Sequence, residues 1–163
     1  MINFYVDGSC KPSNPGPGAF GVIGIKQELN SEETIHYCYS EHFDNTTNNR
    51  MELLAILHVM EKFGHYIFDQ WGVVPRVYSD SAYAVNTFTN WMFNWARNGW
   101  TKSDKKTPEN LDLIKAYYDW YQKGYRIDIR KVKGHNGNKW NEIVDQLATG
   151  KITKEKVEEL YGK

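Results

Sequence analysis

Five separate stretches of the chain are predicted to be β-strands, and in the first and the last of them apolar and polar residues alternate, which is the pattern of half-buried strands. The first stretch alternates Ile2, Phe4 and Val6 with Asn3 and Tyr5. This strand is expected to stop at Asp7, where a turn rich in glycine and proline follows. The expected strands cover residues 2–6, 19–26, 34–43, 73–79 and 125–132.

Apolar residues at helical spacing occur between these strands. One helix should be capped by Thr47 or Asn48 and end at Gly64, and it is apolar nearly all round, so it should be buried at the centre of the fold. Residues 44–48 are expected to form a loop or the cap before it. Further helices are expected over residues 81–88, 90–97, 110–123, from about 140 onward, and 153–160.

The order of these elements predicts an α/β fold. Three consecutive strands favour an antiparallel meander, and the helix after them should cross over to a parallel fourth strand. If the first and fourth strands are neighbours, Asp7 and Asp80 lie at the same edge of the sheet, because each follows a strand. A lone Asp before Gly is more often a turn residue, so Asp7 is a functional candidate only if other carboxylates converge with it.

The length of 163 residues suits a single domain, with residues 150–163 as a helical tail. No apolar run approaches the roughly 18 residues of a membrane span, so we expect a soluble protein that does not bind a membrane. Nothing resembles a signal peptide, and two isolated cysteines favour free thiols in a reducing compartment, which predicts a cytoplasmic location. The net charge of zero gives no overall attraction to nucleic acid, so local basic residues would have to supply it.

Acidic side chains could form a cation site. Glu52 lies on an apolar stripe of its helix, so it either caps backbone amides in the first turn or joins Asp7 and Asp80, with Asp145 as a candidate fourth member. Carboxylates without His or Cys ligands repel each other unless cations lie among them, and all-oxygen ligands select Mg²⁺ or Mn²⁺. Two such ions roughly 4 Å apart would activate water for phosphodiester cleavage.

Tryptophans and basic residues are mixed in one later segment. Trp91, Trp95 and Trp100 lie close to Arg97 and Lys102, a combination suited to stacking on nucleic acid and contacting its phosphates. The alternative is that the tryptophans pack a small helical excursion.

These motifs, in this order, resemble ribonuclease HI, and the resemblance covers residues 2–149. It rests on DGSC with NPGPG, TTNNRMEL, SDS, WMFNWARNGW with DKK, and VKGHNG ahead of an aspartate, all within residues 7–145. The resemblance implies a five-stranded mixed sheet, three strands antiparallel and two parallel, with helices on both faces. It also implies that Asp7, Glu52, Asp80 and Asp145 hold two Mg²⁺ ions, for which Mn²⁺ can substitute, and that His135 assists proton transfer or product departure.

The resemblance assigns substrate contacts as well. The minor groove of an RNA/DNA hybrid, with its 2′-hydroxyls, would be met by Cys10, Asn14, Asn48 and Asn49. A DNA phosphate would be bound by Thr47 and Asn110. The DNA strand would be gripped by a basic protrusion with Trp91, Asn94 and Trp95. The chain departs from that family's pattern by one extra residue in the first turn. Asn45 stands where some members have a basic residue, and Lys139 and Trp140 stand where members often have a proline and acidic residues.

The resemblance therefore implies an endonuclease that hydrolyses the RNA strand of RNA/DNA hybrids and leaves 5′-phosphate and 3′-hydroxyl ends, as that family does. Junction resolvases, integrases and exonucleases of the same broad fold are alternatives, but an exonuclease should carry Asp-x-Glu where Asp7, Gly8 and Ser9 stand. A non-catalytic hybrid-binding module should lack one of the four carboxylates. No polymerase region precedes Met1, which disfavours a reverse-transcriptase fragment. Nothing indicates a protein partner, and a monomer is expected.

Overall fold

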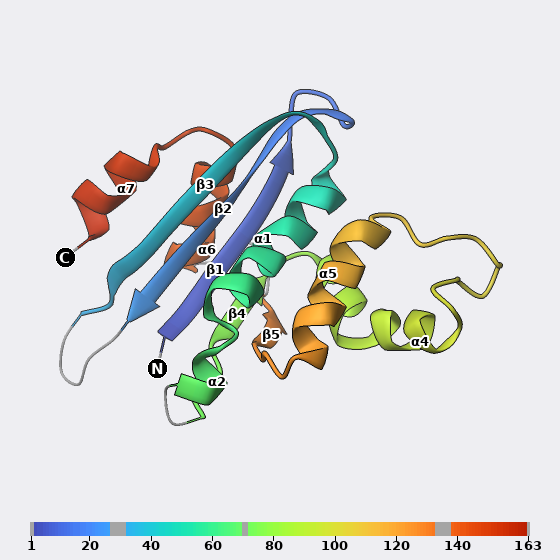
Figure 1. Ribbon diagram of the computed structural model, residues 1–163. Helices are drawn as coiled ribbons and strands as arrows, with labels where there is room; N and C mark the ends of the chain where they lie inside the picture. Colours follow the sequence, from blue (N-terminus) through green and yellow to red (C-terminus); the bar gives the residue numbers. More distant parts are fainter. Residues whose placement is uncertain (1, 27–31, 70–71, 133–137, 163) are drawn as a thin grey trace.

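A five-stranded sheet forms the centre of the computed structural model (Figure 1). The residues described are 2–26, 32–69, 72–132 and 138–162. The strands lie in the order β3-β2-β1-β4-β5, with β1, β2 and β3 antiparallel and β4 and β5 parallel to β1. Their bounds are β1 (Ile2–Cys10), β2 (Gly16–Lys26), β3 (Thr34–Thr46), β4 (Arg76–Ser79) and β5 (Asp128–Lys131). The expected α/β class and mixed sheet are confirmed.

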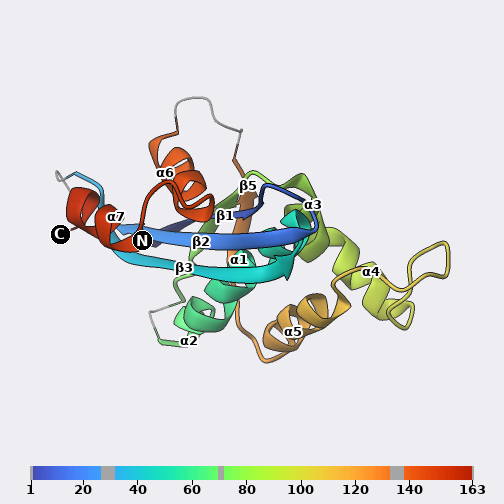
Figure 2. The ribbon, with the colours of Figure 1, turned by 90° about the horizontal axis from the view of Figure 1, so that it is seen from above.

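Helices cover both faces of the sheet (Figure 2). One face carries the long helix α1 together with α5, and the other carries α6, with α7 next to β3. The helical segments are α1 (Asn48–Phe63), α2 (Tyr66–Asp69), α3 (Ala82–Asn86), the π-helical segment η1 (Thr87–Trp91), α4 (Met92–Arg97), α5 (Leu111–Gln122), α6 (Lys139–Ala148) and α7 (Lys154–Tyr161). Among the described residues, no helix is long and apolar enough to cross a membrane.

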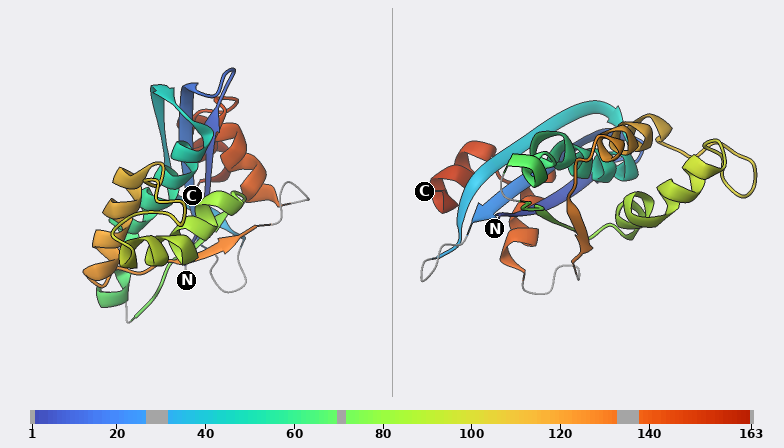
Figure 3. Two further views of the ribbon diagram at one scale, coloured as in Figure 1. Left: turned by 90° about the vertical axis from the view of Figure 1, so that its right-hand side faces the viewer. Right: turned by 60° about the horizontal axis from the view of Figure 1, so that its bottom comes forward.

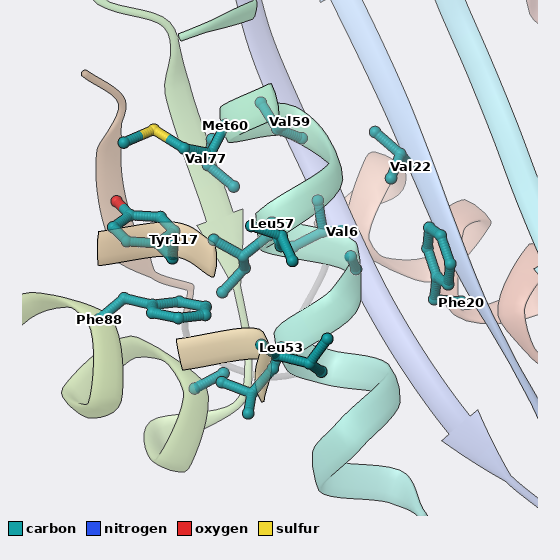
Figure 4. Close-up of a cluster of buried hydrophobic side chains, with 14 of the residues drawn as sticks. Val6, Phe20, Val22, Leu53, Leu57, Val59, Met60, Val77, Phe88 and Tyr117 are labelled. Atoms are coloured by element: carbon teal, nitrogen blue, oxygen red, sulfur yellow. The ribbon is translucent and has the colours of Figure 1, made fainter. Parts of the chain in front are cut away.

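The sheet separates two hydrophobic cores, because successive side chains of a strand point to opposite faces. Phe4 and Val6 of β1 belong to the larger core around α1, in which Figure 4 shows Val6 beside the helix. Tyr5 lies between them in the chain but packs in the second core with Ile23 of β2 and Val144 of α6. Helix α1 buries nine residues and is central, as its sequence predicts. The segment from α4 to α5 projects away from the sheet (Figure 3).

Several strand ends differ from those expected. β1 does not stop at Asp7: antiparallel pairing with β2 continues to the pair Cys10 and Gly18, which holds the strand extended. Parallel pairing with β4, however, ends at Tyr5, so Asp7 still lies beyond the last parallel pair. Residues 44–46, expected as loop, are the end of β3. β4 starts only after Pro75, which has no amide hydrogen for the sheet, and β5 is equally short because β4 is its partner.

The observed ends of α1 agree with the sequence prediction better than the strand ends do. The amide of Arg50 donates to the Thr47 hydroxyl at 3.1 Å, which confirms the predicted cap of α1, and Gly64 follows its last turn. The two helices expected over residues 81–88 and 90–97 are instead one continuous run through α3, η1 and α4, capped by Ser81. The short helix α2 was not predicted.

A buried histidine joins α1 to the antiparallel part of the sheet. Nε2 of His58 lies 2.6 Å from the Tyr37 hydroxyl, and its ring stacks on Tyr39 with centroids 4.3 Å apart. Burial, with a smaller contribution from Lys62, lowers the pKa of His58 to about 4. The folded protein therefore holds this imidazole neutral.

His58 should make the free energy of unfolding depend on pH. In the unfolded chain its pKa returns to about 6.5, so between that value and the folded value of about 4 the unfolded state binds more protons. Stability contributed by neutral His58 is complete above about pH 6.5 and is lost progressively as the pH falls toward 4. Urea unfolding should show that His58→Phe flattens this dependence, whereas His42→Phe, which changes an exposed imidazole, does not. Equal slopes in both variants would contradict the assignment.

Candidate active site

Carboxylates from three elements meet at one edge of the sheet. Within the described residues, Asp7, Glu52 and Asp80 each place an oxygen atom within 4.8 Å of the other two. Asp145 of α6 lines the same hollow, which has a volume of about 310 Å³. The structure therefore brings together all four carboxylates that the sequence singled out.

The topology of the sheet explains this convergence. β1 and β4 are adjacent and parallel, so Asp7, beyond the last parallel pair, and Asp80, directly after β4, lie at the same edge. α1 reaches this edge from one face of the sheet and α6 from the other, and they bring Glu52 and Asp145. No single element could gather four acidic groups that are so far apart in the chain.

Gly8 allows α1 to come unusually close to β1. A Cβ atom at Gly8 would lie 2.4 Å from the backbone nitrogen of Glu52 and 2.5 Å from the carbonyl carbon of Met51, so any other residue would push the helix away. Across this contact the Gly8 amide donates to the Glu52 carboxylate. The backbone partner of Glu52 is thus an amide of β1 and not of its own helix, which decides against the capping alternative.

Burial and crowding favour the protonated forms of Asp7 and Glu52. Burial and then the neighbouring Glu52 carboxylate raise the pKa of Asp7, and Asp80 and Asp145 act in the same direction. Burial also raises the pKa of Glu52, although hydrogen bonds with Asp7, the Gly8 amide and Ser81 oppose the increase. A divalent cation among these groups would offset their repulsion, and its binding would release protons.

The donor set fits a hard cation. The hollow is lined by four carboxylates and by the polar side chains of Ser9, Asn48, Asn49 and Ser81, with no His or Cys among the lining residues that the structure describes. Oxygen ligands of this kind suit Mg²⁺ and Mn²⁺ better than softer metals. His135, expected beside this site, lies outside the described residues.

Hydrogen bonds fix the asparagines next to the carboxylates. The Cys10 amide donates to Oδ1 of Asn48 at 2.6 Å, and the Asn48 amide donates to Oδ1 of Asn14 at 3.2 Å. Because each side-chain oxygen accepts from the backbone, Asn14 and Asn48 have their NH₂ groups left to donate. The Cys10 thiol is buried and lies 3.1 Å from the Ser13 carbonyl and 3.4 Å from that of Thr46, so it braces the turn.

Thr47 and Asn110, predicted to bind phosphate, are brought together by Arg50. They precede α1 and α5, and Arg50 donates to Oδ1 of Asn110 at 3.3 Å while it forms an ion pair with Asp112 at 2.6 Å. The two helix N-termini provide positive potential for an anion, while the charge of Arg50 is balanced by Asp112. The sequence reasoning missed Arg50, although its place three residues after the cap in TTNNRMEL was a usable signal.

The tryptophan segment forms the base of the projecting α4 region. The rings of Trp91 and Trp95 have centroids 6.0 Å apart, and Trp91 meets Tyr83 edge to face at 6.3 Å. Asn94 accepts a hydrogen bond from Arg97. Trp91 is 36% exposed, whereas Trp95 packs partly against the larger core, so the two predicted roles of these tryptophans, packing and surface contact, are both compatible with the structure.

Comparisons with known proteins agree on one family. The family model described as RNase H matches residues 1–153. A Ribonuclease H of Syntrophomonas wolfei is 40% identical over 93% of this chain and 95% of its own length. A Ribonuclease H of Caldanaerobacter subterraneus is 37% identical over 94% of this chain and 92% of its own length. Among solved structures, LC9-RNase H1, "a type 1 RNase H with the type 2 active-site motif", has a TM-score of 0.72 and 28% identity, covering 91% of this chain and 70% of that chain. LC11-RNase H1 in complex with RNA/DNA hybrid has a TM-score of 0.61 and covers 92% of this chain and 95% of that chain. At 19% identity this likeness shows the fold alone.

Asp7→Asn should stabilise the protein in the absence of metal. The amide keeps the shape of the side chain but removes a carboxyl whose raised pKa makes the folded wild type lose stability as the pH rises above the unfolded value of about 3.9. In EDTA at pH 8 we expect a gain of roughly 1–3 kcal/mol, the equivalent of about one to two pKa units. Denaturant unfolding measures this gain, which should disappear near pH 4, and the exposed control Asp119→Asn should show none. A loss of stability at pH 8 would contradict the prediction.

Proposed function

The chain belongs to the RNase H family, and from this membership we propose that it is an endonuclease that hydrolyses the RNA strand of RNA/DNA hybrids. The observation that carries the proposal is the placement of Asp7, Glu52, Asp80 and Asp145 in one hollow. Asn48 and Asn49 border the same hollow and could read the sugar of the bound strand. A purely binding module would gain nothing from four acidic groups that repel the phosphates of its ligand.

The four carboxylates are proposed to hold two Mg²⁺ ions, and Mn²⁺ can substitute for them. Bound there, the ions would supply an activated water and stabilise the leaving oxygen, which gives 5′-phosphate and 3′-hydroxyl ends. Glu52 is already oriented for this task, because the Gly8 amide holds its carboxylate. His135 lies between Gly134 and Gly137 in the sequence, and its unperturbed pKa of about 6.5 suits the proposed proton transfer near neutrality.

Choice of the RNA strand follows from the orientation of the asparagines. The NH₂ groups of Asn14 and Asn48 need acceptors, because both side-chain oxygens already accept from the backbone. A 2′-hydroxyl oxygen is such an acceptor, and deoxyribose lacks this group. The side of the site next to Asp7 and Glu52 should therefore bind RNA in preference to DNA.

The DNA strand would be held by two other regions. Thr47, Asn110 and Arg50 form one, at the N-termini of α1 and α5, and it suits a phosphate. Trp91 and Trp95 form the other and suit stacking or sugar contacts. Contacts of this kind fix the register of the hybrid without reading its sequence.

The class of enzyme is tested by incubating the protein and Mg²⁺ with labelled RNA/DNA hybrid, duplex RNA, single-stranded RNA and duplex DNA. We expect cleavage of the hybrid alone. Asp7→Asn should cut it at less than a tenth of the wild-type rate, a barrier increase above roughly 1.4 kcal/mol, while it still binds the hybrid. Asp119→Asn serves as the control. Cleavage of duplex DNA, or an active Asp7→Asn, would exclude the proposed mechanism.

Strand selection predicts a dependence on the number of consecutive ribonucleotides. Each lost contact with a 2′-hydroxyl should cost roughly 0.5–1.5 kcal/mol, so a single ribonucleotide in a DNA duplex should be cut far more slowly than a run of about four. Asn48→Ala combined with Asn49→Ala should reduce cleavage of the run, whereas Trp95→Ala should mainly weaken binding and change its salt dependence. Efficient incision at the single ribonucleotide would be incompatible with this account of the asparagines.

A further inference from the structure

We propose that Tyr83 is a positioning residue that couples the phosphate pocket of Thr47, Arg50 and Asn110 to the tryptophans of the α4 region. The inference rests on the proposed function, because both regions are assigned there to the DNA strand. No motif in the sequence drew attention to Tyr83. Its role is visible only in the contacts that the fold creates.

The first contact is a hydrogen bond that fixes the amide of Asn110. Nδ2 of Asn110 donates to the Tyr83 hydroxyl at 3.2 Å, and Oδ1 of the same side chain accepts from Arg50 at 3.3 Å. A rotation that exchanged the oxygen and nitrogen of the amide would set its NH₂ group against the Arg50 guanidinium, where two donors would face each other, so Arg50 fixes which end is the oxygen and the Tyr83 hydroxyl accepts from the other end. Since the NH₂ group has two hydrogens, one N–H is left in a fixed direction to donate to a phosphate.

The backbone of Asn110 adds to this constraint. Its φ angle is 59°, in the left-handed region that asparagine adopts more readily than most residues, and it directly precedes the first turn of α5. The side chain therefore leaves the chain in a direction set by the backbone, and Tyr83 holds its far end.

The second contact joins Tyr83 to the protrusion. The Tyr83 ring meets Trp91 edge to face at 6.3 Å, and Trp91 packs on Trp95 at 6.0 Å. The Tyr83 carbonyl accepts from the buried Thr87 hydroxyl at 2.7 Å, at the start of the π-helical segment, which ties the backbone of Tyr83 to the turn that carries Trp91. Tyr83 thus contacts both regions that are assigned to the DNA strand.

This arrangement has a functional consequence. Two contact regions can bind one strand together only if the distance and direction between them match successive sugars and phosphates, and a connecting residue keeps that match. Loss of the hydroxyl should weaken binding of the DNA strand at the pocket. It should leave the reaction at the carboxylates unchanged, because Tyr83 is not among the residues that line their hollow.

The test uses Tyr83→Phe in the full chain, which removes one oxygen and keeps the ring against Trp91. The matched control is Tyr118→Phe, since Tyr118 is also half-buried and packs edge to face on Trp100 at 5.2 Å, with no hydrogen bond to its hydroxyl among the described residues. In hybrid cleavage at fixed salt we expect Tyr83→Phe to raise KM about two- to tenfold, the effect of one lost hydrogen bond, with kcat changed less than about twofold. Tyr118→Phe should change neither.

A second measurement separates positioning from a general loss of structure. A series of hybrids is made in which one phosphate of the DNA strand, at a different position in each, is replaced by an uncharged methylphosphonate. For the wild type, KM should rise for the hybrid whose replaced phosphate would occupy the pocket. Tyr83→Phe should have lost this sensitivity at that position and kept it elsewhere, and it should add nothing in an Asn110→Ala background.

The possible failures can be told apart. If the wild type cleaves the hybrid but Tyr83→Phe behaves like Tyr118→Phe, or keeps the full methylphosphonate sensitivity, the role of Tyr83 is overturned and the proposed function stands. If the wild type does not cleave the hybrid, the proposed function is overturned, and the inference falls with it.

Discussion

The contact between β1 and α1 at Gly8 is the constraint on which the site depends. Only a residue without a side chain lets the backbone of Met51 and Glu52 approach β1 so closely, and the Gly8 amide then holds the Glu52 carboxylate beside Asp7. α1 is also the centre of the larger hydrophobic core, so its position is fixed by packing along its whole length. A side chain at Gly8 would have to displace either the acid or the core.

The fold uses both faces of the sheet to hold groups that repel each other. Packing of α1 on one face and α6 on the other forces Glu52 and Asp145 toward Asp7, and the raised pKa of Asp7 records the resulting cost. The free energy that offsets this repulsion comes from apolar burial elsewhere in the fold, since each fully buried apolar side chain contributes about 1.5–3 kcal/mol. The site is therefore strained electrostatically by the same packing that makes the rest of the chain stable.

Most of this could be predicted from the sequence because it depends on local patterns. Alternation indicated the first and last strands, and turn residues helped to bound the others. Thr47 and Gly64 marked the ends of α1, and two strands that each lead to an aspartate suggested the site. The end of β1 was wrong because pairing with β2 decides it, and the π-helical turn between α3 and α4 has no counterpart in apolar spacing. Tyr83 was missed because it meets Asn110 across 27 residues of chain, which no local pattern reveals. Arg50 meets Asn110 across 60 residues, and only its place in TTNNRMEL marked it in the sequence.

The position of Asp145 on α6 has a consequence for the synthesis of the protein. The four carboxylates of the hollow are spread from residue 7 to residue 145, and the last of them is carried by a helix that packs on β1 and β2. A ribosome must therefore release almost the whole domain before α6 can dock and the acidic group is complete. A nascent or prematurely terminated chain, even one with β1 to β5 in place, holds only three of the four acids, so the hydrolytic activity proposed for the finished protein is withheld until translation of the domain is nearly over.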